Sequence, residues 1–388
     1  MTAIKLAIRN LWGAKLRTFL NIAVLSFAFV VMVFYNGLLD GWNRQGKLDM
    51  EEWEAGNGVY WSEGYDPYDP YTLQDGHTPL PAERGVGKRA PVLIVQGTIY
   101  PEGRMMNIQI KGIDPEQKIL KLPTGALKEG EEKEGEIPAI IGKRMAKATG
   151  LRKGDYVLIR WRDKNGTFDA REGEIKEIFN CNVGTVDNNQ IWIPLKRLQE
   201  MTGLENEATI IVTGKGDTPT EYEGWEFKDL TYLEREVDEI IETKKAGKTV
   251  ITILLLSIAL LAIFDTQVLS IFRRQKEIGT YIALGMTRND VIKIFTVEGS
   301  MNSVLALILA SLYGLPLFYY ISLAGIPMPQ AVDEMGVAIG EKIFPYYEAG
   351  GLIISILIVI ISATIVSYLP SRKIAKLNPN EALKGKIQ

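Results

Sequence analysis

The chain has 388 residues, of which 46% are hydrophobic, and 44 basic against 47 acidic residues give a formal net charge of −3. The single cysteine and the single histidine exclude an internal disulfide and a multi-histidine zinc site. Basic residues form no long continuous surface of the kind that binds nucleic acid, so no nucleic-acid partner is expected.

Four apolar runs are each long enough to cross a membrane. They cover residues 19–39, 249–272, 299–326 and 349–369, and Asp265 is the only charged residue within them. A bilayer core about 30 Å thick is crossed by about 20 helical residues, so we predict four transmembrane helices. The first run is too long for the apolar part of a signal peptide and is interpreted as an uncleaved anchor.

Basic residues predict the orientation of these spans. Residues 1–18, 273–298 and 370–388 are rich in Lys and Arg, whereas residues 327–348 are acidic. Under the positive-inside rule, both termini and segment 273–298 lie in the cytoplasm. Residues 40–248 then form a large extracytoplasmic domain between the first two spans, and residues 327–348 form a short extracytoplasmic loop.

Helical patterns extend beyond the spans. Residues 3–12 are predicted to form a short basic amphipathic helix suited to the inner membrane surface. The helix of the first span is predicted to continue to about Ala55, and an amphipathic helix is predicted to lead into the second span. The two extensions could form a stalk below the external domain, or they could be separate juxtamembrane helices.

The external domain starts with a loop-like segment. Residues 56–90 are rich in Gly, Pro, Asp and Tyr, which is typical of loops. The spacing of Asp66, Asp69 and Asp75 does not fit a calcium-binding loop. The aromatic residues of this segment could line a recognition surface, although packing on the domain is the simpler interpretation.

Short strands are predicted after residue 90. They cover residues 91–100, 106–113, 155–162, 172–179 and 189–195, with short helices at 140–149 and 196–202. This alternation predicts an α+β domain. We therefore expect a membrane protein with four transmembrane α-helices and a large α+β extracytoplasmic domain inserted between spans 1 and 2.

The segment between the second and third spans predicts two helices joined by a tight elbow. Gly285 stands where a left-handed residue ends a helix, and Thr287 can cap the next helix with Asp290 three positions later. Such an elbow could take a push from a soluble partner. The alternative is an ordinary amphipathic loop.

The one sequence pattern that resembles a catalytic motif does not fit that motif. Ala246-Gly247-Lys248-Thr249 resembles the end of a P-loop, but Glu242 occupies the position of its first glycine and the preceding sequence is helical. Asp265 is a candidate intramembrane functional group, because a carboxylate is costly in lipid. It could gate, pair across a subunit interface, or simply be hydrated near the inner third of the membrane.

Three stretches carry a resemblance to a known family. KEIGTYIALGMTRNDVIKIFTVEG resembles the signature REIGxxxALGAxRxxIxxxFxxEg of the FtsX/MacB superfamily of ABC permeases. LPSRKIAKLNPNEALKG and AIRNLWGAKLRTFLNIAVLSFAF resemble its closing and opening motifs, with Leu369 replacing the usual aromatic residue. In the external domain, IIGKRMAKATGLRKGDYVLI and DNNQIWIPLKRLQEMTGL resemble its weaker MacB-type motifs.

The resemblance implies a dimeric permease, made of identical or paralogous chains in membrane lipids, bound to two copies of an ABC ATPase. ATP and magnesium would be bound by that partner, so this chain would have no cofactor and no catalytic or metal-binding residues. The family's coupling helix falls on the following residues: Lys276, Glu277, Ile278, Gly279, Ala283, Leu284, Gly285 and Arg288.

The family works by mechanotransmission, in which ATP binding by the partner moves the stalk and the external domain. The four-span layout and the loop IPMPQAVDEMGVAIGEKIFPYY look most like the lipoprotein-releasing LolC/LolE branch, which implies a lipoprotein substrate at the inner membrane. Two alternatives are MacB-like export of peptides, toxins or drugs, and FtsX-like signalling to a cell-wall hydrolase without transport.

Overall fold

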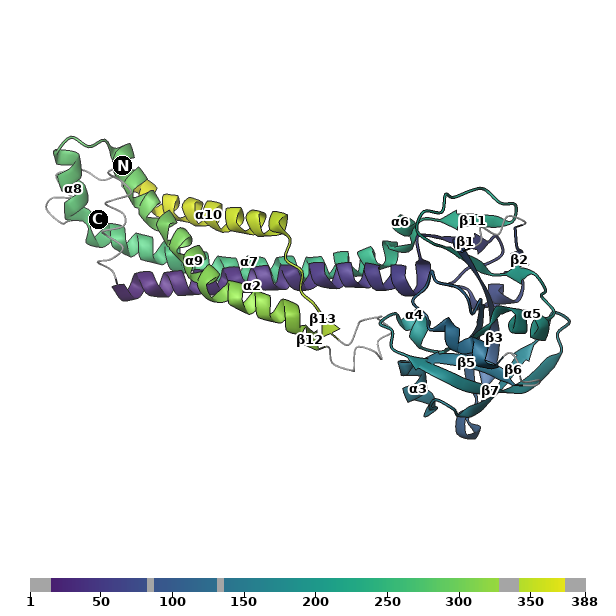
Figure 1. Cartoon of the computed structure of the whole chain (residues 1–388). Coiled ribbons are helices and arrows are strands. Elements are labelled where there is room, and N and C mark those ends of the chain that lie inside the picture. Colours follow the sequence, from purple (N-terminus) through teal and green to yellow (C-terminus); the bar gives the residue numbers. More distant parts are fainter. Residues whose placement is uncertain (1–14, 82–86, 131–135, 328–341, 374–388) are drawn as a thin grey trace. The chain divides into compact units, whose positions relative to one another are not determined.

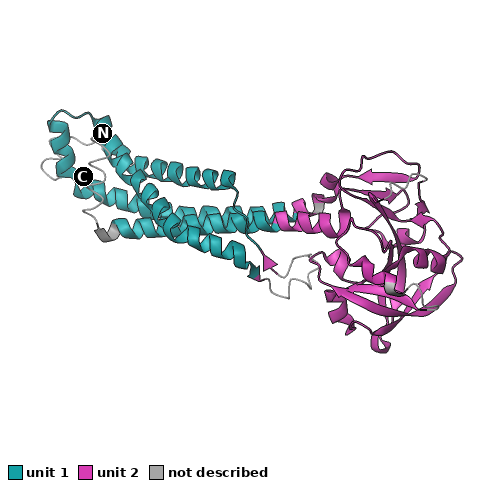
Figure 2. Cartoon of the chain, viewed as in Figure 1, with its two compact units in different colours: residues 1–42, 240–326, 344–388 teal, residues 43–239, 327–343 magenta. Residues whose placement is uncertain are grey.

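The computed structural model describes residues 15–81, 87–130, 136–327 and 342–373 (Figure 1). The chain divides into two compact units, which Figure 2 shows in different colours. Unit 1 comprises residues 1–42, 240–326 and 344–388, and unit 2 comprises residues 43–239 and 327–343. The predicted helix at 3–12 and the predicted cap at Asn378 lie outside the described residues.

Four helices are long and apolar enough to cross a membrane. They are α2 (Lys15–Met50), α7 (Arg235–Arg273), α9 (Arg288–Ala324) and α10 (Ala349–Ser371). Each overlaps one predicted span, and three of them extend well beyond it into polar sequence. Pro316, which the sequence predicts either to kink the third span or to mark its outer end, lies inside α9. The chain is thus a membrane protein with four candidate spans.

The predicted extensions of the first two spans are confirmed as helix. α2 continues to Met50 and is followed by a π-helical turn, Glu51–Ala55, while α7 begins at Arg235. Inside unit 2 the two helices are tied together, because Lys47 Nζ lies 2.8 Å from Glu234 Oε2 and 2.9 Å from Asp238 Oδ1. The structure therefore favours a helix pair over two unrelated juxtamembrane helices.

Small residues allow the helices of unit 1 to pack closely. The shared core includes Leu25, Ala28, Val33, Ala259, Ile263, Ala306, Ala310, Val359 and Ala363. Between membrane helices, small side chains let the backbones approach and gain dispersion contacts. A non-helical segment also packs closely on α2, since a Cβ added to Gly41 would lie 2.2 Å from the Phe344 carbonyl oxygen.

Unit 2 is an α+β unit around a nine-stranded mixed sheet. The strands are β1 (Val59–Ser62), β3 (Arg89–Ile99), β4 (Met106–Ile113), β5 (Ile137–Gly142), β6 (Tyr156–Arg162), β7 (Phe168–Phe179), β8 (Gln190–Pro194), β10 (Ile210–Thr213) and β11 (Trp225–Lys228). Their order is β11-β1-β10-β3-β4-β8-β5-β7-β6. Because β6 also pairs with β3, the six strands from β3 to β6 close on themselves as a barrel.

Alternation along the barrel strands separates two cores. Ile108 and Ile110 of β4 belong to an inner cluster with Leu93, Ile159 and Ile191. The opposite face of the sheet packs a second cluster that includes Trp53, Ile94, Val186 and Trp192. Cys181 is free and buried among this second cluster. The unit thus has an apolar core on both faces of its central strands, as a domain without a disulfide requires.

Short elements complete the two units. They are η2 (Pro70–Gln74), β2 (Thr78–Pro79), η3 (Pro101–Gly103), η4 (Thr124–Gly130), α3 (Lys143–Thr149), α4 (Gly184–Asp187), α5 (Leu195–Thr202), β9 (Glu207–Ala208), α6 (Leu230–Leu233), α8 (Gln275–Ala283), β12 (Ile326–Pro327) and β13 (Lys342–Ile343). The five predicted strands correspond to β3, β4, β6, β7 and β8, and the helix at 196–202 corresponds to α5.

Two local predictions are wrong. Residues 140–142 are not helical but end strand β5, because they pair with β7 in the sheet. Segment 56–90 is not only loop, since β1 lies inside the sheet between β10 and β11. Its aromatic residues serve two purposes: Tyr60 is buried against Phe227, whereas Tyr71 is 90% exposed.

One lysine is buried on the sheet. Lys111 of β4 lies next to Trp192, and burial lowers the pKa of its ammonium group, an effect that the charge of Glu54 opposes. The folded chain thus releases this proton at a lower pH than the unfolded chain. Between those two pKa values the unfolded chain binds more protons, so the free energy of unfolding should rise with pH up to about 10.5.

We expect Lys111→Met to increase the free energy of unfolding at neutral pH and to remove this rise, because methionine fills the same volume without a charge. The measurement is urea unfolding of the whole chain, followed by tryptophan fluorescence from pH 7.5 to 10. Lys118→Met, at an exposed position, is the control. If the free energy of unfolding of Lys111→Met rose with pH as steeply as that of the wild type, the rise would not come from Lys111.

Candidate functional site: a helical elbow in unit 1

The predicted elbow is built as two helices with a defined turn between them. α8 follows α7 after Arg274, and Gly285 has the predicted left-handed conformation, with φ of 96°. Gly285 N donates to Ile282 O at 3.1 Å, and Met286 N donates to Tyr281 O at 3.1 Å. These two hydrogen bonds form the Schellman motif, which satisfies carbonyl groups at the end of α8.

The start of α9 is capped as predicted. Thr287 Oγ1 accepts a hydrogen bond from Asp290 N at 3.2 Å, and the Thr287 hydroxyl donates to Asp290 Oδ2 at 2.5 Å. An N-cap of this kind satisfies one of the free N–H groups of the first turn. Both ends of the turn are therefore fixed by local hydrogen bonds, and residues 284–287 have little freedom to extend either helix.

A separate apolar cluster holds α8 against its neighbours. Ile278 of α8 is fully buried with Ile271 of α7 and with Val291 and Phe295 of α9. Tyr281, Ile282 and Met286 pack against the same cluster. The short helix is thus fixed by one buried face to the helices on both sides of it.

An ion-pair clamp closes the elbow. Arg274 Nη1 donates to Glu298 Oε2 at 2.9 Å and to Oε1 at 3.2 Å, while Arg274 Nε donates to Glu277 Oε2 at 2.7 Å. The guanidinium carbon lies 4.9 Å from the centre of the Phe295 ring. The side chain of Glu298 is only 8% exposed.

The clamp was not predicted. Arg274 and Glu298 are 24 positions apart, and only the return of α9 beside the end of α7 brings them together. Helix spacing could have identified Glu277, three residues after Arg274, as a partner of Arg274. It could not have identified Glu298, the second partner. A basic residue just after one apolar run and an acid just before the next were the only available signals.

The predicted coupling residues divide into two groups. Ile278 and Gly279 are buried and fix α8 in place. The others, Lys276, Glu277, Ala283, Leu284, Gly285 and Arg288, are exposed around the turn, and the Leu284 side chain is 79% exposed. The elbow therefore presents a small surface with an apolar residue at its tip, mounted on a rigid base.

Comparisons with known proteins match this part of the chain. Residues 249–379 match the family described as "FtsX-like permease C-terminal". The chain is 23% identical over 248 residues to the "lipoprotein-releasing system transmembrane protein LolC" of Neisseria meningitidis serogroup B, which covers 56% of this chain and 58% of LolC. It is 26% identical over 156 residues to the "macrolide export ATP-binding/permease protein MacB" of Psychrobacter cryohalolentis, covering 38% of this chain and 21% of MacB.

The chain is thus similar to ABC transporter permeases of the FtsX/MacB superfamily, with the FtsX-like match confined to residues 249–379. It is also 27% identical over 167 residues to the ABC transporter permease MJ1507 of Methanocaldococcus jannaschii, covering 41% of this chain and 39% of that protein. The matched segments thus span little more than half, or less, of these relatives. Together with this similarity, the four helices that are long and apolar enough to cross a membrane support a multi-pass protein of the inner membrane.

Asp265 lies apart from the elbow of the permease. It is exposed on α7, about 14 Å along the helix axis from Arg274. The exposed apolar residues on the same face are Val250, Leu254, Ile258, Leu261, Leu269 and Phe272. Within the described ranges, Asp265 has no recorded hydrogen bond or ion pair, and its role stays a prediction.

Buried polar side chains continue from the clamp into the helix bundle. Gly299 follows Glu298, and a Cβ added to it would lie 2.2 Å from Ser367 Oγ of α10 and 2.9 Å from Gln267 Nε2 of α7. Three helices therefore meet at Gly299, one residue from the clamp.

The described residues contain no group of three or more His, Cys, Asp or Glu side chains that could hold a metal ion. The elbow instead combines an exposed turn, with Leu284 at its tip, and the buried ion pair between Arg274 and Glu298.

Proposed function

We propose that this permease couples ATP hydrolysis by a partner ABC ATPase to movement of unit 2, by mechanotransmission. The elbow is the contact with the ATPase, through Lys276, Glu277, Ala283, Leu284, Gly285 and Arg288. The observation that carries the proposal is the rigid mounting of this exposed tip by the Arg274–Glu298 clamp and the buried Ile278. Because α8 is fixed to α7 and α9 in this way, a force on the tip moves those two helices and not α8 alone.

The basic residues of segments 273–298 and 370–388 support an orientation with the elbow and both termini in the cytoplasm. Unit 2 is then extracytoplasmic. The uninterrupted helices α2 and α7 each contribute residues to both units, which supports their role as the mechanical link. A second permease, identical or paralogous, and two ATPase subunits would complete the assembly.

The proposed substrate is a lipoprotein at the outer face of the membrane. The similarity to LolC, whose name describes a lipoprotein-releasing system, supports this choice. Export of peptides or drugs is the second candidate, supported by the similarity to MacB. Reconstitution with an ABC ATPase and a labelled lipoprotein separates them: ATP turnover without departure of the lipoprotein from the membrane would reject release.

Two substitutions test the elbow. We expect Gly285→Pro and Glu277→Lys to abolish co-purification with the ATPase, while unit 2 stays folded. Proline cannot adopt the positive φ of Gly285 and removes the hydrogen bond from its N–H to Ile282 O. Lysine at position 277 removes one carboxylate partner of Arg274 and places a like charge beside it.

The measurement is capture of ABC ATPase subunits from the same organism, co-expressed with the tagged permease. Glu116→Lys is the matched control, because it also breaks an exposed ion pair, with Lys128, but lies in unit 2. Normal capture by both elbow variants would argue against the proposed contact.

A further inference from the structure

One face of the barrel in unit 2 carries a row of carboxamides in place of apolar side chains. Gln96 of β3 pairs in register with Gln109 of β4, which pairs with Gln190 of β8. Side chains of residues paired across strands point to the same face of a sheet. Beside this row, Thr98 pairs with Asn107, and the next pair toward the apolar core is Ile94 with Lys111.

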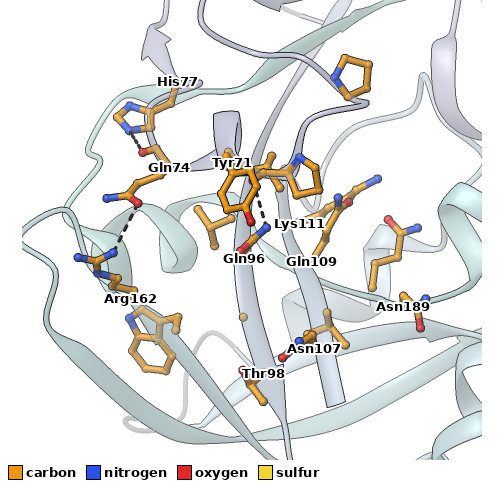
Figure 3. A pocket seen from close by; sticks show the side chains of 18 of the residues that line it. Tyr71, Gln74, His77, Gln96, Thr98, Asn107, Gln109, Lys111, Arg162 and Asn189 are labelled. Atoms are coloured by element: carbon orange, nitrogen blue, oxygen red, sulfur yellow. Dashed lines mark hydrogen bonds between the residues drawn. The ribbon is translucent and has the colours of Figure 1, made fainter. Parts of the chain in front are cut away.

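A hollow of about 1020 Å³ lies over this face (Figure 3). One wall is the η2 segment, which carries Pro70, Tyr71 and Gln74, and Gln96 Nε2 donates to Pro70 O at 3.1 Å. Figure 3 shows Tyr71 above Gln96, with Lys111 and Gln109 beside them. The Tyr- and Pro-rich segment thus forms part of a binding-sized cavity.

Lys111 is the buried charge of this hollow. Its Nζ lies 3.4 Å from Thr185 O and 5.1 Å from the centre of the Trp192 ring. None of the ion pairs recorded among the described residues includes it. Glu54, which also lines the hollow, instead accepts a hydrogen bond from Thr185 Oγ1 at 2.7 Å. The charge of Glu54 acts on Lys111 without forming an ion pair with it, and a buried ammonium group without a directly paired anion is costly.

Gln190 provides a second, independent signal. Its side chain is 2% exposed, and Nε2 donates to Thr185 O and to Asn188 O. Its Oε1 is buried and has no hydrogen-bond partner in the described structure. A buried acceptor left without a donor costs about 1–3 kcal/mol. Lys111 and Gln190 both line the hollow, so a ligand that brings a negative charge and a hydrogen-bond donor would match them.

We propose that the hollow binds a peptide segment that ends in a free carboxylate. The carboxylate pairs with Lys111 Nζ, and the N–H of the last peptide bond donates to Gln190 Oε1. The carboxamides of Gln109 and Gln96 each offer one acceptor and a donor group, which matches the next peptide groups. Tyr71 and Pro67 form the apolar wall.

An acidic sugar would supply the charge but not the planar amide groups that the carboxamide row matches. Among the acids of the lining, Asp163 already accepts from Asn165 N and Thr167 N, and Glu54 accepts from Thr185. Asp75 is the remaining acid of the lining, so at most one carboxylate without a side-chain hydrogen bond faces sugar hydroxyls among the described residues. This inference concerns unit 2 alone and does not depend on the proposed transport function.

The test is calorimetric titration of the whole permease in lipid nanodiscs with trialanine, with its carboxyl-terminal amide, and with glucuronate. We expect trialanine to bind at least about tenfold more tightly than the amide, because the amide keeps every N–H but lacks the charge. Glucuronate, which has the charge without the amide groups, should bind more weakly than trialanine.

Two variants localise the binding. Lys111→Met should remove the preference for the free carboxylate, and the exposed Tyr71→Ala should weaken trialanine binding by about fivefold while leaving the fold intact. Lys118→Met, outside the hollow, should bind as the wild type does. Equal affinity for trialanine and its amide, tighter binding of glucuronate, or unchanged binding by both hollow variants would overturn the proposal.

Discussion

Replacing Glu298 with alanine is expected to destabilise unit 1 by about 3 kcal/mol, because the guanidinium of Arg274 would lose its more buried carboxylate partner. The side chains of Arg274 and Glu298 are only 17% and 8% exposed, so water would not readily replace the lost partner. Glu277→Ala should cost about 1 kcal/mol or less, since the Glu277 side chain is 56% exposed. Unfolding of the purified permease in detergent by increasing SDS measures both values.

The double variant Arg274→Met/Glu298→Leu provides the control. Removing both charges leaves neither member of this pair as a buried unpaired charge, so the double variant should regain most of the stability lost in Glu298→Ala. If Glu298→Ala and Glu277→Ala were equally stable, the clamp would contribute no more than a surface ion pair. If the double variant were no better than Glu298→Ala, packing of the Glu298 side chain and not its charge would explain the loss.

The elbow shows what local sequence can predict. The left-handed Gly285 and the cap formed by Thr287 and Asp290 were predicted because each depends on residues within four positions. The clamp between Arg274 and Glu298 depends on the return of α9, and no local pattern contains that information. Hydropathy indicates that Glu298 is close to an apolar run, but not which basic residue reaches it.

In the sheet, too, features that depend on local sequence were predicted, and features that depend on distant residues were not. Strands β3, β4, β6, β7 and β8 were predicted because their β-branched residues alternate clearly. β1 was missed because glycine and proline surround it, and its strand conformation is fixed by pairing with β10 and β11. The burial of Lys111 was also not predictable, since a lysine in an alternating strand normally marks the solvent face.

Gly142→Ala is expected to prevent stable folding of unit 2, with a loss of more than about 3 kcal/mol. Gly142 ends β5 and precedes α3, and its φ of −76° is open to any residue, so backbone strain is not the reason. An added Cβ would lie 2.6 Å from both the Cα and the carbonyl oxygen of Asp187, and 1.9 Å from its Oδ1. These are mainly backbone atoms, which cannot rotate away.

Movement of Asp187 would carry a further cost. Its side chain is 1% exposed, accepts from Arg144 N at 3.1 Å and pairs with Arg144 Nη1 at 2.9 Å, so the first turn of α3 depends on it. Limited proteolysis of the whole permease should therefore cut unit 2 rapidly in Gly142→Ala but not in Gly125→Ala, where an added Cβ meets nothing within 4 Å. Equal resistance of the two variants would mean that α4 shifts to make room for the methyl group at little cost, and that Asp187 does not fix the position of α3.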